Sequence, residues 1–282
     1  MAAPAIEAVE RGLLDEDSIL ARAPGENFSV ASLVLGPRAR RHLRAIYGFA
    51  RLVDQIGDEA SSDRLALLDA LEADVERAFA GDPRHALLQA LVPSIRECGF
   101  PRAPFQRLIE ANRQDQRVSR YETFGELVAY CDLSANPVGE LVLYVFDAAT
   151  PERIAFSDRV CTALQLLEHW QDVGEDFVRG RVYVPQEDLR RFGVEESDFA
   201  AAHASERLRE LLAFEVARAR EWLDDGAALV RTLHGRGRIA VAGYVAGGRA
   251  NLDSIVAANY DVLGLKPRAG RMRRVVETLR AL

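Results

Sequence analysis

A chain of 282 residues with 49% hydrophobic content can bury a substantial core, as one large domain or two small ones. Its net charge of -7 and pI near 5.4 argue against a general nucleic-acid-binding protein, whose surface would be basic. No apolar run approaches the roughly 18 residues needed to span a bilayer, and the acidic N-terminus is unlike a secretory signal. Together with three cysteines at no short spacing (Cys98, Cys131 and Cys161), these features predict a soluble, cytoplasmic protein with reduced thiols.

Helical periodicity dominates the chain, and no alternating strand pattern stands out. Apolar residues spaced three and four apart predict amphipathic helices, for example over 65–79 and 208–223. Breaks are expected at Pro24-Gly25, Gly36-Pro37, Gly81 to Pro83, Gly99 to Pro101, Thr150-Pro151, Pro185, Gly235 to Gly237 and Lys266-Pro267. They divide the chain into roughly ten helices with short joints. We therefore expect one all-α domain over 1–282, in which residues 1–20 can be loosely ordered.

The first helix with a chemical signature covers residues 44–58. Arg44, Tyr47, Arg51, Asp54 and Asp58 fall at offsets 0, 3, 7, 10 and 14, which places them on one helix face. The positions between them are mostly apolar. A polar stripe on an apolar helix is typical of a helix that lines a cavity or meets a partner, because isolated buried charges are costly. A surface ladder of salt bridges is the alternative.

A second region of interest runs from Phe124 to Phe146 and contains Pro137 at its centre. Proline removes an amide donor and clashes with the preceding turn, so we expect a kink near Ala135. A plain helix–loop–helix is the alternative. The apolar run 141–146, like the run 239–248 later in the chain, suits a core helix better than a membrane contact.

A second polar stripe covers residues 165–179. Its members are Gln165, Glu168, Asp172, Asp176 and Arg179, at offsets 0, 3, 7, 11 and 14. Like charges four residues apart disfavour one another and call for a positive partner. Two such faces turned toward each other would form a site for several Mg²⁺ ions and an anionic substrate, because Mg²⁺ prefers carboxylate and water oxygens and bridges to phosphates.

Histidine gives a weaker signal. His42, His85, His203 and His234 have no partners at metal-ligand spacing and are interpreted as surface or packing residues. His169 is adjacent to the second stripe but faces about a quarter turn away from it, so it receives no role. The sequence contains no glycine-rich phosphate loop after a strand and no serine or cysteine nucleophile signature.

At these residues the chain resembles the squalene and phytoene synthase family, the head-to-head isoprenoid synthases, from about Asn27 to Tyr260. The segments that carry the resemblance are the two aspartate motifs, Tyr47 to Glu59 and Gln165 to Pro185. The resemblance implies an all-α isoprenoid synthase fold around a central cavity, with Mg²⁺ held by both motifs and a prenyl diphosphate substrate. The implied metal ligands are Asp54, Asp58, Asp172 and Asp176, with Glu168 as a further one. The implied catalytic residues are Tyr47, Arg51, Tyr130, Gln165 and Tyr244, and the implied substrate contacts are Asn27, Phe28, Arg51, Asn136 and Arg179.

Finer features resemble one branch, the hydroxysqualene synthases of bacterial hopanoid pathways. Among them are the segments 25–32, 113–117, 130–139 and 169–172. That resemblance implies ionisation of presqualene diphosphate, rearrangement of the cation and capture by water, with no NADPH expected. Gln171 stands where many members of the family place an arginine, and Glu168 replaces a common asparagine. Fewer phosphate-binding groups would fit an enzyme that ionises one diphosphate instead of condensing two.

Two other functions stay open at this point. A condensing synthase would make presqualene diphosphate, squalene or phytoene from two prenyl diphosphates. A non-catalytic assembly factor of the same fold is a different class, but all four aspartates remain, and loss of activity would be expected to erode them first. The group that positions the attacking water is not identified; Asn136 and Gln165 are the candidates. The substrate would also allow peripheral contact with the inner face of the membrane and with downstream pathway enzymes.

Overall fold

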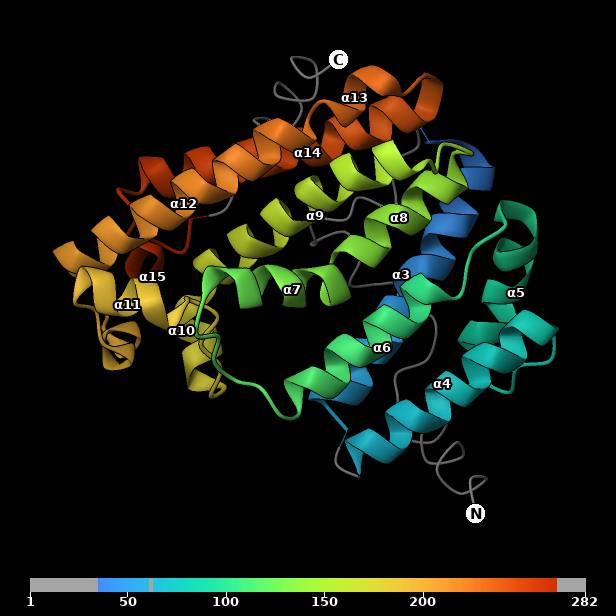
Figure 1. Cartoon of the computed structure of the whole chain (residues 1–282), viewed down its shortest axis with the longest axis horizontal. Helices are drawn as coiled ribbons and strands as arrows, with labels where there is room; N and C mark the ends of the chain where they lie inside the picture. Colours follow the sequence, from blue (N-terminus) through green and yellow to red (C-terminus); the bar gives the residue numbers. More distant parts are fainter. Residues whose placement is uncertain (1–34, 61–62, 268–282) are drawn as a thin grey trace. The chain divides into compact units, whose positions relative to one another are not determined.

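The computed structural model describes residues 35–60 and 63–267 of the chain. The expected substrate contacts Asn27 and Phe28, and the expectation for residues 1–20, fall outside these ranges. The helices are α3 (Gly36–Asp58), α4 (Arg64–Ala80), α5 (Ala86–Cys98), α6 (Ala103–Asp115), α7 (Phe124–Ser134), α8 (Asn136–Val145), α9 (Pro151–Gln171), α10 (Val173–Val178), α11 (Gln186–Phe192), the 3-10 helix η3 (Glu196–Ala200), α12 (Glu206–Gly226), α13 (Leu229–Thr232), α14 (Gly235–Ala257) and α15 (Val262–Leu265) (Figure 1). In these ranges the only β-type pairing is an isolated bridge between Arg120 and Val182. The predicted all-α class is confirmed.

The chain divides into two compact units. Unit 1 takes its described residues from Met1–Arg117 and Pro137–Thr150, and unit 2 from Val118–Asn136 and Pro151–Leu282. Each unit is described separately below. The expectation of one domain over 1–282 stays a prediction.

Unit 1 is built around α3, which packs against α4, α5 and α6. Leu43, Ile46 and Leu52 have no exposed surface, as the apolar face of a buried helix requires. Phe49 of α3 meets Phe105 of α6 edge-on, with ring centroids 5.0 Å apart. This packing fixes the rotation of α3 and therefore the direction in which its polar stripe points.

Unit 2 is built around α9, which packs against α12, α14 and α7. Leu166, Leu167 and Trp170 of α9 are fully buried or nearly so. Figure 1 shows α12 and α14 running alongside α9 for much of its length. Since one face of α9 is held in this core, its other face is left to carry the second polar stripe.

Most of the predicted helix ends are confirmed. Gly81 and Gly99 follow α4 and α5 with φ of 94° and 67°, a left-handed conformation that glycine adopts without strain. Pro151 starts α9 and Pro185 precedes α11. Gly237 differs from expectation because it lies inside α14. The described residues contain more helices than the expected ten, since short helices such as α10, α13 and α15 have too few residues to show periodicity.

The region around Pro137 is two helices with a break at Ala135. The last turn of α7 closes with the Ala135 amide donating to the Cys131 carbonyl at 3.0 Å. Helix α8 then starts at Asn136, so Pro137 occupies its first turn, where a missing amide donor is harmless. The break expected near Ala135 is therefore present, and it separates two helices joined by this one residue, whose backbone is itself in the helical region.

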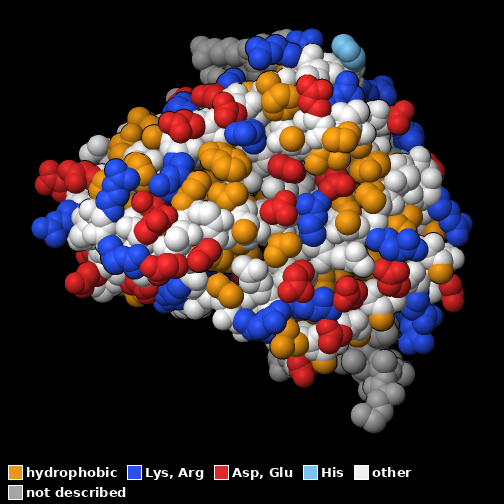
Figure 2. Space-filling model, in the orientation of Figure 1, with side chains coloured by type: hydrophobic (Ala, Val, Ile, Leu, Met, Phe, Trp, Pro, Cys, Tyr) orange, Lys and Arg blue, Asp and Glu red, His pale blue; other side chains and the backbone are white. Residues whose placement is uncertain are grey.

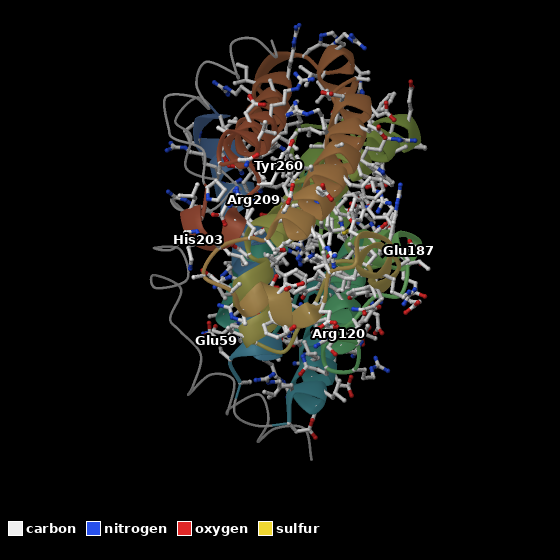
Figure 3. The ribbon with its side chains drawn as sticks, turned by 90° about the vertical axis from the view of Figure 1, so that its left-hand side faces the viewer. Glu59, Arg120, Glu187, His203, Arg209 and Tyr260 are labelled. Carbon is white, nitrogen blue, oxygen red and sulfur yellow. The ribbon has the colours of Figure 1, made fainter. Side chains whose placement is uncertain are left out.

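Near the end of the described residues, Asp261, which precedes α15, binds the segment 203–204 and helix α12 of unit 2. Its carboxylate accepts hydrogen bonds from the Ala204 amide at 2.8 Å, from the His203 ring at 2.9 Å and from Arg209 at 3.2 Å (His203 and Arg209 are labelled in Figure 3). Burial alone would raise the pKa of Asp261, but these donors lower it to about 2. The carboxylate is thus charged at neutral pH and connects α12 to α15.

The surface of the described residues is mixed in charge. On the face in Figure 2, acidic and basic side chains lie interspersed with apolar ones. Leu141, Val142 and Leu143 of one apolar run, and Ala240, Val241 and Ala242 of the other, are buried, in agreement with the core interpretation. Within 35–60 and 63–267, no helix has the length and apolarity required to cross a membrane. The three cysteines form no disulfide.

Candidate active site

The first acidic pair lies on α3, in unit 1, as the periodicity predicts. Tyr47, Arg51, Asp54 and Asp58 all belong to this one helix. Tyr47 is 4% exposed, whereas Arg44 and Asp58, at the two ends of the stripe, are open to solvent. The Arg51 guanidinium lies 3.9 Å from the Asp54 carboxylate, close enough for a weak ion pair.

Asp54 is the perturbed member of this pair. Its pKa is raised to about 6, mainly because surrounding protein atoms desolvate the carboxylate, although 48% of its side-chain surface still reaches solvent. Arg51 and a 3.4 Å hydrogen bond from Asn112 Nδ2 oppose the shift, and the negative charge of Asp58 adds to it. A Cβ at Gly57 would meet Asn112 Oδ1 at 2.0 Å, so the glycine allows Asn112 to approach α3. Sequence reasoning missed Asn112, which is distant in the chain.

The second acidic pair lies in unit 2, where α9 gives way to α10. Helix α9 ends at Gln171 and α10 begins at Val173, so Asp172 precedes α10 and Asp176 lies inside it. Asp172 still bonds to both helices, because its amide donates to the Glu168 carbonyl at 3.0 Å and its carbonyl accepts from the Asp176 amide at 2.8 Å. The stripe is therefore carried by two helices and the joint between them, and not by one continuous helix.

The pKa of the Asp176 carboxyl group is raised further than that of Asp54. Its pKa is raised to about 7, first by desolvation and then by the negative charge of Asp172, with a smaller contribution from Glu168. Arg179 and Arg181 lower it in part. The predicted members Glu168, Asp172, Asp176 and Arg179 thus interact electrostatically in unit 2, and Arg181 joins them.

These carboxylates suit Mg²⁺ in their chemistry. In each unit, at least one carboxyl group is destabilised in its charged form by burial and by a neighbouring acid, a cost that a bound cation would remove. Within the described ranges, no group of three or more His, Cys, Asp or Glu residues is placed to hold a metal. Mg²⁺ commonly binds through one or two carboxylates together with water and substrate phosphates. Each acidic pair could supply the carboxylates. The expectation that the two faces meet stays a prediction.

An aromatic cluster stands beside the second stripe. The rings of His169 and Tyr183 stack at 3.7 Å with an interplanar angle of 14°, and Tyr130 lies 5.8 Å from Tyr183. Tyr121 stacks on the Tyr183 ring at 5.9 Å. The segment carrying Tyr183 is held by hydrogen bonds from Val182 N to Ser119 O and from Gln186 N to Tyr121 O, both 2.9 Å. The cluster gives the expected catalytic residue Tyr130 a defined environment.

His169, to which the sequence assigned no role, is 6% exposed and lies within this cluster. Its pKa is lowered to about 3, chiefly by burial and further by the positive charge of Arg181, so the imidazole is neutral. Its Nε2 lies 3.3 Å from Nε2 of the expected catalytic residue Gln165. Helix spacing could not reveal that His169 belongs to this cluster, because its stacking partner Tyr183 comes from outside the helix.

Of the remaining expected residues, Tyr244 lies on α14 of unit 2, and burial raises the pKa of its hydroxyl above the usual value. The Asn136 side chain is 5% exposed and is bound within unit 2: its Nδ2 donates to Asp132 at 3.4 Å and its Oδ1 accepts from Thr162 Oγ1 at 3.1 Å. Gln171 Nε2 donates to the Pro267 carbonyl at 2.5 Å. The side-chain amides of Asn136 and Gln171 therefore form hydrogen bonds within the protein itself.

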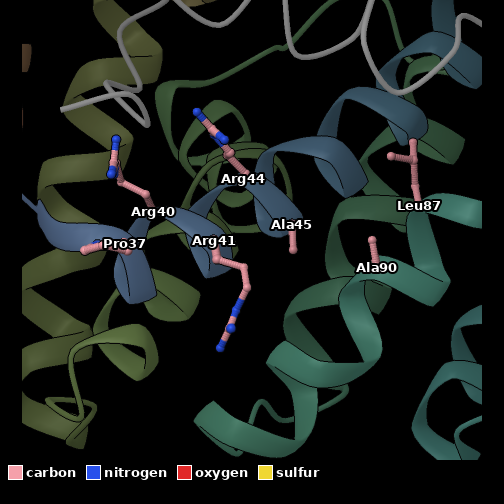
Figure 4. A pocket seen from close by; sticks show the side chains of 7 residues that line it. All are labelled: Pro37, Arg40, Arg41, Arg44, Ala45, Leu87 and Ala90. Carbon is pink, nitrogen blue, oxygen red and sulfur yellow. The ribbon is translucent and has the colours of Figure 1, made fainter. Parts of the chain in front are cut away.

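A separate pocket of about 410 Å³ lies in unit 1, between α3 and α5. It is lined by Pro37, Arg40, Arg41, Arg44, Ala45, Leu87 and Ala90 (Figure 4). Arg41 already pairs with Glu97 at 2.6 Å. Asp54 lies nine positions beyond Ala45, the last lining residue on α3, a rise of about 14 Å along the helix, so this pocket is distinct from the acidic pair.

Comparison with known proteins places these motifs in a family. A family model described as squalene/phytoene synthase matches residues 21–276. The chain is 34% identical over 251 residues to 15-cis-phytoene synthase of Synechocystis sp., covering 84% of this chain and 74% of the relative. It is 36% identical over 209 residues to hydroxysqualene synthase of Sinorhizobium fredii, covering 73% and 70%. The crystal structure of squalene synthase HpnC from Alicyclobacillus acidocaldarius has 40% sequence identity and a TM-score of 0.80, covering 92% of this chain and 96% of that one.

Proposed function

Because the chain belongs to the squalene/phytoene synthase family, we propose that it converts presqualene diphosphate into hydroxysqualene and diphosphate in a Mg²⁺-dependent reaction. The observation that carries the choice of reaction is Gln171, whose side chain donates to the Pro267 carbonyl. An arginine at this position would bring a positive charge to a second diphosphate, and an amide tied to the backbone does not. The similarity to a hydroxysqualene synthase supports the same choice.

In this proposal the acidic pairs act before the carbon chemistry. Asp54, Asp58, Asp172 and Asp176, with Glu168, would hold Mg²⁺, which when bound neutralises the charge that develops on the leaving diphosphate. Arg51 and Arg179 would contact the diphosphate oxygens, since a guanidinium offers planar, charge-assisted hydrogen bonds. These residues lower the barrier to ionisation by electrostatic means alone.

The aromatic residues act after ionisation. Tyr130 and its ring partner Tyr183 in unit 2 present π-electron faces, which favour a nearby cation. Tyr47 of α3 and Tyr244 of α14 would stabilise the cation in the same way. Since water ends the reaction by adding to the cation, no hydride donor is needed, and we expect no requirement for NADPH.

A condensing synthase is the second candidate, and the phytoene synthase relative at 34% identity favours it. It would join two prenyl diphosphates before any further step. The two candidates differ in the substrate they accept, so a direct assay separates them.

Purified protein supplied with presqualene diphosphate and Mg²⁺ is expected to release hydroxysqualene, detected by mass spectrometry, with no product when the metal is chelated. Farnesyl diphosphate alone is expected to give nothing. A C30 product from farnesyl diphosphate would establish the condensing reaction instead. If neither substrate reacts, and Asp54→Asn leaves cellular function unchanged, a non-catalytic role would replace both.

A further inference from the structure

His169 makes two contacts that fix it in place. Its ring stacks on Tyr183 at 3.7 Å, and its Nε2 lies 3.3 Å from Gln165 Nε2, one helical turn earlier on α9. The side chain is almost fully buried. It can therefore neither rotate freely nor exchange this contact for one with water.

The contact with Gln165 determines the roles of both groups. A carboxamide nitrogen only donates, so the imidazole Nε2 must accept, and the ring proton resides on Nδ1. The nitrogen of the Gln165 carboxamide then points toward His169, and its oxygen, on the same carbon atom, points away from His169. Within the described residues, Gln165 Oε1 has no hydrogen-bond donor and is not sealed away from solvent. This oxygen is the available acceptor.

Asn136 is the other candidate for contact with water. It differs from Gln165 in the bonding of its amide oxygen and in its burial. Its oxygen already accepts from Thr162 and its nitrogen donates to Asp132, and the side chain is buried. Its oxygen has a second lone pair, but the residue is only 5% exposed, so a water that captures the cation has little access to it. Of the two amides, Gln165 is the one with an acceptor to offer.

We infer that His169 is a positioning residue that holds the Gln165 carboxamide so that its oxygen orients the water which captures the cation. This inference rests on the proposed function. It needs no proton transfer to or from the imidazole, whose task is to accept one hydrogen bond and to keep the amide from rotating.

The step it governs is a competition between two fates of the cation. The C–O bond to diphosphate breaks with both electrons leaving on the diphosphate oxygen. The cyclopropylcarbinyl cation then rearranges, breaking C–C bonds of its three-membered ring and forming the new chain linkage. A water lone pair forms the new C–O bond to the rearranged cation, and the departed diphosphate accepts the proton from this water, giving an alcohol. A cation that is not captured loses a neighbouring C–H proton to the same diphosphate and gives an alkene. Orienting the water favours the alcohol without changing how substrate binds.

The test is the alcohol-to-alkene ratio formed from presqualene diphosphate by the whole chain with Mg²⁺. His169→Phe keeps a flat ring against Tyr183 and removes the acceptor, and we expect the ratio to fall about tenfold with KM unchanged. Gln165→Leu should lower the ratio to a similar level, and the double variant should lower it no further, because both act through one contact. His169→Gln, which restores an acceptor, should retain more alcohol than His169→Phe. Melting temperatures of all variants control for folding.

The outcomes separate the inference from the proposed function. Wild-type protein that forms hydroxysqualene supports the proposed function whatever the variants do. An unchanged ratio in His169→Phe, or a double variant whose effect is the product of the single effects, would overturn the role of His169 alone. If the wild type forms no alcohol, both fall together.

Discussion

Glu215 of α12 is a buried acid away from the aspartate motifs. It has no exposed surface, and its Oε2 shares the Arg218 guanidinium, at 3.3 Å, with Asp188, whose Oδ2 lies at 2.9 Å. Burial is the main reason that the pKa of Glu215 is raised to about 8, and the charge of Asp188 adds to the shift while Arg218 opposes it. Glu215 is thus protonated in the folded protein at neutral pH.

This protonation makes stability depend on pH in a defined direction. Between the ordinary glutamate pKa of about 4.3 and about 8, the folded protein holds a proton that the unfolded chain releases, so the free energy of unfolding falls as pH rises. Glu215→Gln cannot titrate and should show a flatter decline, with the largest gain over wild type near pH 8. Urea unfolding at several pH values from 5 to 8.5 measures the difference. Parallel curves for the two proteins would contradict it.

Asp176 gives a second pH dependence, in metal binding. With its pKa raised to about 7, this carboxyl group is largely protonated at pH 6 and must lose a proton to bind a cation. We expect added Mg²⁺ to raise the melting temperature more at pH 8 than at pH 6, and Asp176→Asn to weaken the response at both. Asp82→Asn, whose side chain is 95% exposed, is the matched control. An equal response of the wild type at both pH values would argue against this role of Asp176.

At the scale of elements, close helix packing depends on small residues that periodicity does not identify. A Cβ at Gly226, the last residue of α12, would lie 2.8 Å from the Val160 amide and 2.9 Å from the Phe156 carbonyl of α9. These are backbone atoms, so the contact cannot be relieved by turning a side chain. The glycine lets the two central helices of unit 2 approach each other.

Gly226→Ala should therefore destabilise the protein by about 1–3 kcal/mol. Gly247→Ala on α14 is the control, because nothing lies within 4 Å of its added Cβ and alanine favours the helix. Its melting temperature should equal or exceed that of wild type. Equal destabilisation by both substitutions would show that the close contact at Gly226 is not the cause, because nothing lies near the added Cβ at Gly247. An unchanged stability of Gly226→Ala would show that α9 and α12 can separate.

Sequence signals for elements were reliable where they were local. The start of α3 at Gly36-Pro37 and the end of α4 at Gly81 follow from the backbone preferences of proline and glycine. The break at Asp172 was not anticipated, because Gln165 to Arg179 keep helical spacing through it. A break of one residue that keeps the side chains at helical spacing leaves no trace in periodicity.

For the molecule as a whole, the all-α class, the helix faces that carry both acidic pairs, and the family all follow from the amino-acid sequence alone. Helical spacing and like-charge pairs are properties of short segments, so they can be read without coordinates. The side chains that reach those faces from other parts of the chain are known from the folded structure and not from the sequence. Three contacts join residues that are distant in the chain. They are Asn112 with Asp54, Tyr183 with His169, and Pro267 with Gln171. Their contacts arise because packing of the apolar faces brings separate helices together, and no local pattern encodes the neighbour that packing will supply.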